Sequence, residues 1–295
     1  ELLTEVATYV VGSGGKRIRP TVILLAFYAA GGEDPSDAIE IASAMELIHN
    51  ATLIHDDIND GGTLRRGMEA AYKKFGIGTS LVAGDYLFTR GFEIGGKFPE
   101  RVVNITARAC VKLAEGEIKQ LRNLRNVDLR SEDYLDIVMR KTAMPISSGA
   151  EVGAIFGGGT EAQIRALADY GLNLGICFQI IDDILDVMGT KDVLGKPIGT
   201  DIREGNMTLI PIFALGNGVS REDEELRAIL LKEEKTESEV SEALRILKES
   251  GAVEQAREKA NKYAETAKEC LSVPLVEKFK DRLIALTDFI LERSY

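Results

Sequence analysis

Residues 35–60 read PSDAIEIASAMELIHNATLIHDDIND, and the pattern in this segment extends through most of the chain. Apolar side chains recur every three or four positions, which is typical of a helix with one face in a core. Pro35 and Ser36 suit the first turn of that helix. The segment therefore predicts one long helix whose last turns carry a cluster of carboxylates.

The same helical spacing recurs on both sides of this segment. It covers residues 99–124, 131–156, 161–188, 222–232, 236–249, 251–271 and 274–293. Alternation typical of strands is scarce, glycine clusters mark the breaks, and no low-complexity linker divides the chain. Residues 1–295 are therefore predicted to form a single all-α domain of roughly ten or more helices.

The composition narrows the possible functions. The 295 residues include 36 Lys and Arg against 47 Asp and Glu, and the net charge of −11 argues against a nucleic-acid partner. Two histidines exclude a zinc site built from several His, and three scattered cysteines predict no disulfide framework. The cysteines indicate reduced thiols in a cytoplasmic protein, and no run of about 18 apolar residues predicts a transmembrane helix.

Two aspartate clusters share one spacing. Asp56, Asp57 and Asp60 stand at positions i, i+1 and i+4, and the segment DDILD at 182–186 repeats this pattern. Like charges so close on a helix repel each other unless a cation bridges them. An acidic run can also be a solvated surface, but both clusters follow apolar segments. The pattern therefore favours sites for Mg²⁺, which binds carboxylates together with substrate phosphates.

Basic residues lie near both acidic clusters in the sequence. They occur as Lys16, Arg17 and Arg19 in a glycine-bounded loop, as Arg65-Arg66 after the first cluster, and as Lys141 and Lys196. Guanidinium and ammonium groups suit phosphate oxygens, although any one such pair is often only an exposed ion pair. Carboxylates with Mg²⁺ and nearby cations together predict a site for a phosphorylated substrate.

These motifs resemble those of the trans-polyprenyl diphosphate synthases. The matching motifs are GGKRIRP at 14–20, DDIND with the following Arg65-Arg66-Gly67, Lys141-Thr142, and Phe178-Gln179 leading into DDILD. They occur in the family's order from residue 1 to about 211. The resemblance implies an isoprenoid-synthase-type helical bundle around a deep central cavity, assembled as a homodimer. It also implies head-to-tail condensation of isopentenyl diphosphate with an allylic diphosphate.

The resemblance further implies a role for each matching residue. About three Mg²⁺ ions would be held on the allylic diphosphate by Asp56, Asp57, Asp60, Asp182, Asp183 and Asp186. The same diphosphate would contact Arg65, Lys141 and Lys196. Isopentenyl diphosphate would bind to Lys16, Arg19, His49 and Arg66. Thr142 and Gln179 would turn their oxygens toward the allylic carbocation.

Helical spacing supports part of this assignment independently. His49 precedes Asp56 by seven residues, so both lie on one stripe of the predicted helix with Asp60. A lone histidine near an apolar run is more often a core residue, but this position favours a functional one. His55 lies off the stripe and is predicted to be structural.

The residues before the first cluster bear on product length. In the family, Phe or Tyr four or five residues before the first aspartate closes the pocket early, whereas these positions are Thr52 and Ala51 here. Ile48 and Met45 follow farther down, so the helix runs about 16 Å from Asp56 to Met45. The resemblance therefore implies a chain of roughly C25 to C40.

Three departures and three alternatives accompany this interpretation. Asn206 replaces a lysine of the family, Pro145 should kink the helix after Thr142, and a family helix before residue 1 is expected to be truncated. One alternative is a short-chain geranylgeranyl or farnesyl diphosphate synthase. Less favoured are a class I terpene cyclase, which normally lacks the second DDxxD cluster, and a non-catalytic regulatory subunit, which tends to lose both.

Overall fold

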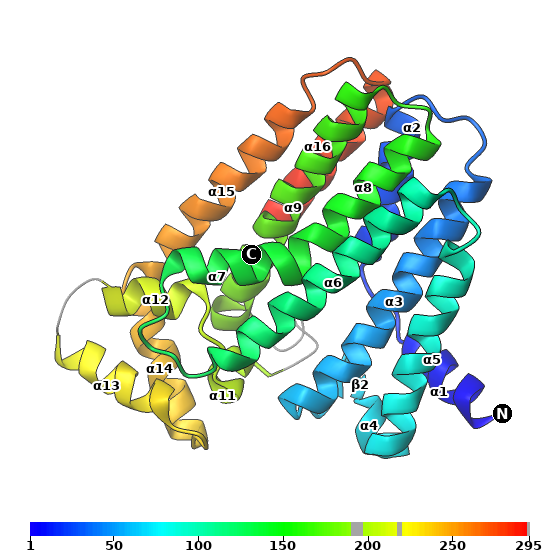
Figure 1. The fold of residues 1–295 in the computed structure, drawn as a ribbon. Coiled ribbons are helices and arrows are strands. Elements are labelled where there is room, and N and C mark those ends of the chain that lie inside the picture. The colour runs from blue at the N-terminus through cyan, green and yellow to red at the C-terminus, as the bar shows by residue number, and fades with distance from the viewer. Residues whose placement is uncertain (190–196, 217–219, 294–295) are drawn as a thin grey trace. The chain divides into compact units, whose positions relative to one another are not determined.

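A computed structural model describes residues 1–189, 197–216 and 220–293 of the chain. Helices dominate this part of the chain (Figure 1), and its strands form one short antiparallel pair, β1 (Leu64–Arg65) and β2 (Met68–Glu69). The all-α prediction is confirmed. No helix of the described residues combines the length and the apolar character needed to cross a membrane.

The chain divides into two compact units. The first comprises Glu1–Arg108, Ser148–Ala168 and Val273–Leu283. The second comprises Ala109–Ser147, Asp169–Ser272 and Ile284–Tyr295. The single domain over residues 1–295 and its deep central cavity stay predictions.

The helices are distributed over both units. The first unit holds α1 (Leu2–Gly12), α2 (Ile18–Ala29), α3 (Ser36–Asp60), α4 (Ala71–Phe75) and α5 (Ile77–Gly95). The second holds α7 (Ser131–Val138), a π-helical turn η1 (Met139–Ala143), α11 (Thr200–Glu204), α12 (Leu209–Gly216), α13 (Arg221–Leu231), α14 (Glu237–Glu249) and α15 (Ala252–Cys270). Both units share the residues of α6 (Glu100–Arg122), α8 (Met144–Phe156), α9 (Glu161–Met188) and α16 (Glu277–Glu292).

Helix α3 is the long helix predicted from residues 35–60. Pro35 is its N-cap, and Gly61 ends it in a left-handed conformation with φ of 68°. It lies alongside α5 (Figure 1), and the close approach depends on small residues. A Cβ atom on Gly91 of α5 would lie 2.8 Å from the carbonyl oxygen of Ala44. His55 occupies the equivalent space at Gly84, so its ring packs between these helices as predicted for a structural residue.

The helix predicted for residues 131–156 is present, but its hydrogen bonding changes in the middle. The structure has α7, the π-helical turn and α8 in its place. Pro145 has no N–H to donate to an earlier turn, and the N–H of Met144 reaches five residues back to the carbonyl of Met139. The irregularity expected near Pro145 is therefore a widened turn that lies immediately before α8.

The helices of the C-terminal third are confirmed, with boundaries close to those predicted. Ser220 and Asp223 form a reciprocal capping box at the start of α13, and Thr236 and Glu239 form another at α14. Such boxes satisfy backbone N–H groups that have no partner within the helix. They explain why these charged segments begin where they do.

Candidate functional site

The last turns of α3 present aspartates in two different environments. Asp56 and Asp60 are partly exposed, whereas Asp57 is only 4% exposed. Asp57 Oδ1 accepts a hydrogen bond from Arg65 Nε at 2.7 Å and a second from Arg65 Nη2. Burial raises the pKa of Asp57, and the Arg65 charge opposes that shift. Asp57 therefore has an internal counterion, unlike a carboxylate presented to solvent.

A tight hairpin directs the side chains of Arg65 and Arg66 to different partners. Arg66 and Gly67 form its two-residue turn with φ of 53° and 76°, the signs of a type I′ turn. Arg65 turns back to α3, while Arg66 Nη1 donates to Ser13 Oγ at 3.2 Å and to the carbonyl of Gly14. The hairpin thus joins the end of α3 to the basic loop that precedes α2.

Gly15 makes room for the Arg66 guanidinium. A Cβ atom at Gly15 would lie 2.7 Å from Arg66 Cζ, and its φ of 118° is rare for any other residue. Gly15, which is predicted to bound the basic loop, is therefore also required because a larger residue would collide with Arg66. Lys16, the next residue, is exposed.

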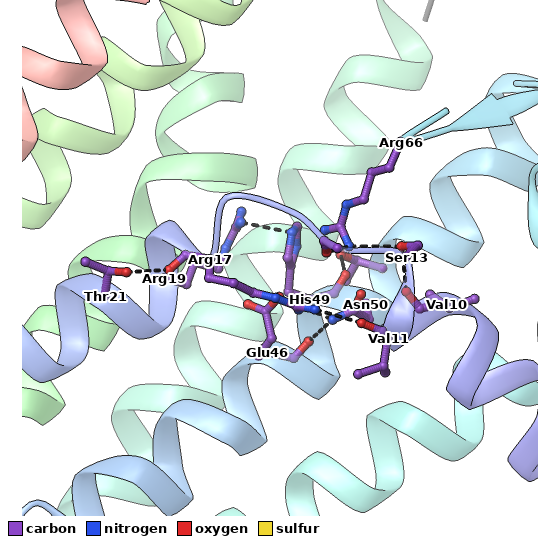
Figure 2. A network of polar contacts seen from close by, with 12 residues as sticks. Val10, Val11, Ser13, Arg17, Arg19, Thr21, Glu46, His49, Asn50 and Arg66 are labelled. Atoms are coloured by element: carbon purple, nitrogen blue, oxygen red, sulfur yellow. Dashed lines mark hydrogen bonds and ion pairs between the residues drawn. The ribbon is translucent and has the colours of Figure 1, made fainter. Parts of the chain in front are cut away.

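Figure 2 shows how the basic loop is fixed to α3. Arg17 adopts a left-handed conformation with φ of 50°, pairs with Glu46, and donates from Nη2 to the carbonyl of Val11 at 2.7 Å. Buried Asn50 donates to the carbonyl of Glu46 at 2.7 Å. Sequence reasoning missed Glu46 and Asn50, although Glu46 lies three residues before His49 and Asn50 directly follows it on the same helix.

The contact between Arg19 and His49 determines what the histidine can bind. Arg19 Nη1 lies 3.1 Å from His49 Nε2 (Figure 2). Since a guanidinium only donates, Nε2 must accept and the proton sits on Nδ1. Burial, and then the charge of Arg19, lowers the pKa of His49 well below 6.5. Burial also lowers the pKa of Arg19 to about 10, so Arg19 stays charged near neutrality. His49 is therefore a neutral residue with one N–H left to donate.

We expect His49 to make the protein less stable as the pH falls. The unfolded chain protonates this histidine near pH 6.5, whereas the folded protein resists protonation among Arg17, Arg19, Arg65 and Arg66. The unfolded state then binds more protons below pH 6.5, so stability is lost there by up to about 1.4 kcal/mol per pH unit.

Urea unfolding of the wild type and of His49→Gln between pH 5 and 7.5 measures this effect. Glutamine can accept from Arg19 but does not titrate. The wild type should lose stability relative to the variant as the pH falls below 6.5. Parallel pH profiles would show that His49 protonates freely in the folded state. His55→Gln is the matched control.

A chain of hydrogen bonds links the candidate residues of the second unit. Thr142 Oγ1 donates to Gln179 Oε1 at 3.0 Å, and Gln179 Nε2 donates to Asp183 Oδ1 at 2.9 Å. The hydroxyl of Tyr134 donates to Asp183 Oδ2. Burial raises the pKa of Asp183 to about 7, against the hydrogen bonds from Tyr134 and Gln179. No sequence pattern pairs Tyr134 with Asp183, which is 49 residues away, so Tyr134 was missed.

The other two aspartates of the second cluster differ in burial, as the aspartates of the first cluster do. Asp186 is 1% exposed, and its two oxygens accept from the backbone N–H groups of Thr200 at 3.2 Å and Asp201 at 3.0 Å. Asp186 therefore holds the start of α11. Asp182 is partly exposed, and its Oδ1 lies 3.6 Å from Arg293 Nη2. The Arg293 guanidinium also lies over the ring of Phe178 at 5.3 Å.

The remaining predicted residues have definite surroundings, with one exception. Lys141 pairs with Glu117 of α6, and Asn206 accepts from Gln120 at 2.9 Å and donates to Glu204 at 3.0 Å. Lys196 lies outside the described residues. The structure thus groups the predicted residues into one set in each unit.

The residues assigned to product length lie in the first unit. Ala51 is fully buried and packs with Ile54 and Leu87. Ile48 is 6% exposed, and half-buried Thr52 donates to the carbonyl of His49 at 2.8 Å. Their role in setting product length stays a prediction.

The candidate ligands fit a divalent cation that is coordinated partly by protein carboxylates and partly by oxygens of a substrate. In the part of the chain that the structure describes, no group of three or more His, Cys, Asp or Glu side chains is gathered closely enough to hold a metal ion. Mg²⁺ rarely requires such an all-protein cage, because it usually takes one or two carboxylates, phosphate oxygens and waters. Asp56 and Asp60 of the first unit and Asp182 of the second are partly exposed, so each unit offers a carboxylate suited to such a cation.

Comparisons with known proteins agree along the chain. Residues 1–247 match the family model described as polyprenyl synthetase. The short chain isoprenyl diphosphate synthase of Methanothermobacter thermautotrophicus is 38% identical over 100% of this chain and 91% of its own length. The octaprenyl diphosphate synthase of Haemophilus influenzae is 35% identical over 100% and 89%. A crystal structure of polyprenyl synthase from Caulobacter crescentus, complexed with calcium and isoprenyl diphosphate, is 37% identical with a TM-score of 0.95, covering 99% of this chain and 89% of that one.

Proposed function

Since the chain belongs to the polyprenyl synthetase family and its relatives are prenyl diphosphate synthases, we propose the following reaction for this prenyltransferase. It condenses isopentenyl diphosphate head-to-tail with an allylic diphosphate and releases an all-trans product of roughly C25 to C40, the length that the small residues Ala51 and Thr52 below Asp56 imply. Relatives that make short products and relatives that make octaprenyl diphosphate are similarly close. The product length therefore rests on Ala51, Thr52 and Ile48.

One observation carries the proposal. Helix α3 presents two partly exposed carboxylates, Asp56 and Asp60, and two turns earlier it presents the neutral His49 against Arg19 of the basic loop. One rigid element therefore carries candidate ligands for a metal–diphosphate and a donor for a second diphosphate. A site for a single phosphate ester would need only one of these.

The aspartates divide into ligands and positioning residues. We assign Asp56, Asp60 and Asp182 to about three Mg²⁺ ions on the allylic diphosphate, because these three carboxylates are partly exposed whereas the other three are buried. Bound there, Mg²⁺ supplies positive charge that stabilises the leaving diphosphate. Asp57, Asp183 and Asp186 instead hold Arg65, the Gln179–Tyr134 pair and the start of α11.

The remaining residues act on the substrates. Arg65, Lys141 and Lys196 bring charge to the allylic diphosphate, and isopentenyl diphosphate binds Lys16, Arg19, His49 and Arg66. Ionisation of the allylic C–O bond releases diphosphate and leaves an allylic carbocation. The isopentenyl double bond attacks this cation, and the released diphosphate takes the proton that the isopentenyl unit then loses. Thr142 and Gln179 offer oxygens to that cation, and exclusion of water prevents its capture as an alcohol.

The test is an incubation of the purified protein with isopentenyl and farnesyl diphosphates and Mg²⁺, with products separated by chain length. We expect products of roughly C25 to C40 that disappear when EDTA removes the metal. Dominant C15 or C20 products would contradict the chain length alone. Cyclic hydrocarbons made without isopentenyl diphosphate would favour a cyclase, and no turnover would favour a regulatory subunit.

The homodimer is part of the same proposal. Helix α5 exposes apolar side chains along one stretch, with Ile77 59%, Leu81 47%, Val82 53% and Tyr86 37% exposed. A second copy of the chain is the occupant we assign to these side chains, because burial against a partner would remove their apolar surface from water. Sedimentation velocity of the purified protein gives its mass.

A further inference from the structure

The π-helical turn at Met139–Ala143 fits against two glycines of the second unit. A Cβ atom on Gly116 of α6 would lie 2.7 Å from the backbone nitrogen of Lys141 and 2.9 Å from Arg140 Cβ. A Cβ atom on Gly175 of α9 would lie 2.6 Å from Ala143 Cα. Side chains essentially never approach backbone this closely, so the turn fills the space that each glycine leaves open.

The same two helices also hold the side chains of the turn. The ammonium of Lys141 pairs with the carboxylate of Glu117, the residue after Gly116. The hydroxyl of Thr142 donates to Gln179, which is one helical turn after Gly175. Each helix therefore contributes one glycine that receives the backbone and one polar residue that receives a side chain.

The widened turn explains why two side chains of this segment reach α9. Tyr134 and Thr142 are eight residues apart, which would separate them by about 80° around a regular α-helix. A π-helical turn rotates less per residue and reduces this offset. Tyr134 then contacts Asp183, and Thr142 contacts Gln179. The position of the turn is thus coupled to both ends of the hydrogen-bonded chain.

We propose that Gly116 and Glu117 form a seat for Lys141 that sets how well the enzyme binds the allylic diphosphate. Both are positioning residues, because Gly116 acts through the Lys141 backbone and the Cβ atom of Arg140, and Glu117 acts through the Lys141 ammonium. The inference rests on the proposed function, in which Lys141 contacts that diphosphate. Sequence alone places Gly116 and Glu117 in an ordinary charged helix, where they carry no signal.

Gly116→Ala is the first test. Alanine normally favours a helix over glycine, so a loss of function here would come from the displaced turn. We expect kcat/KM for farnesyl diphosphate to fall about a hundredfold, as for a small misplacement of a substrate-binding group. The KM for isopentenyl diphosphate should stay within about twofold, because that substrate is assigned to Lys16, Arg19 and His49 and not to residues of the turn. Gly216→Ala is the control, since nothing lies within 4 Å of its Cβ position.

Glu117→Gln tests the seat without adding bulk. If Gly116→Ala does not fold, this variant alone tests whether the seat positions Lys141. The substitution keeps an acceptor for the ammonium and removes the charge. Binding of inorganic pyrophosphate, followed by calorimetry, should weaken about tenfold, the usual value of a charge-assisted hydrogen bond. Glu93→Gln, which alters an exposed pair with Arg90, should bind like the wild type.

Lys141→Ala separates the two levels of the proposal. If this variant binds pyrophosphate as the wild type does, the role of Lys141 in the proposed function is wrong. If it binds weakly while Gly116→Ala and Glu117→Gln behave like the wild type, the seat is wrong and the proposed function stands. A rise in both KM values together in Gly116→Ala would also overturn the seat, because it indicates general damage to the fold.

Discussion

Replacing Asp60 with asparagine should leave the protein folded but nearly inactive. Asp60 is the last residue of α3, and no basic residue lies in that last turn. A carboxylate at a helix C-terminus opposes the helix dipole by about 0.3–1 kcal/mol, but Asp60 is also attracted by the charge of Arg65, so the substitution should change stability little. The lost metal ligand should lower kcat/KM by about a hundredfold or more, the usual cost of one electrostatic contact to a transition state.

Asp186→Asn is the matched comparison because the same substitution should act in the opposite way. Asp186 is buried and accepts from two backbone N–H groups, so the variant should lose about 1–3 kcal/mol of stability. Its Mg²⁺ requirement should stay close to that of the wild type. Urea unfolding and Mg²⁺ titration of kcat/KM measure both variants. Wild-type activity in Asp60→Asn would refute the division of the six aspartates.

The second large effect concerns the product. Ala51→Phe should shorten it from roughly C25–C40 to C15 or C20, because a phenyl ring one turn below Asp56 would block the path of the growing chain. Ala51 is fully buried against Ile54 and Leu87, so the ring must displace neighbours. We therefore also expect a stability loss of about 1–3 kcal/mol from overpacking.

Two further variants separate the change in product from the change in stability. Ala51→Leu adds less volume and should give intermediate lengths with a smaller stability loss. Ala256→Phe overpacks the fully buried face of α15 and should leave the product distribution unchanged. Analysis of dephosphorylated products by chain length measures all three. An unaltered distribution in Ala51→Phe would mean that this position does not border the growing chain.

The parts of the fold that could be predicted depend on local sequence. The period of α3, its end at Gly61 and the spacing of its aspartates can be read from neighbouring residues. The same holds for His49, because its distance from Asp56 in the chain fixes its place on the helix.

The parts that could not be predicted depend on partners far away in the chain. Six aspartates look equivalent in the two DDxxD segments, but Arg65, Tyr134 and the start of α11 remove three of them from solvent. The π-helical turn likewise depends on Gly116 and Gly175, which no periodicity connects to residues 139–143. Sequence patterns identify the residue types at a site, whereas packing determines which of these residues are exposed and which are held by other parts of the chain.

The internal partners of three aspartates bear on how the enzyme is handled and regulated. Asp57, Asp183 and Asp186 are satisfied by groups of the polypeptide itself, so the fold does not depend on a cation to cancel its densest negative charge. Purification in chelator should yield an intact apoprotein that regains turnover when magnesium returns. Cation occupancy then becomes a reversible control on flux, separate from the lifetime of the protein.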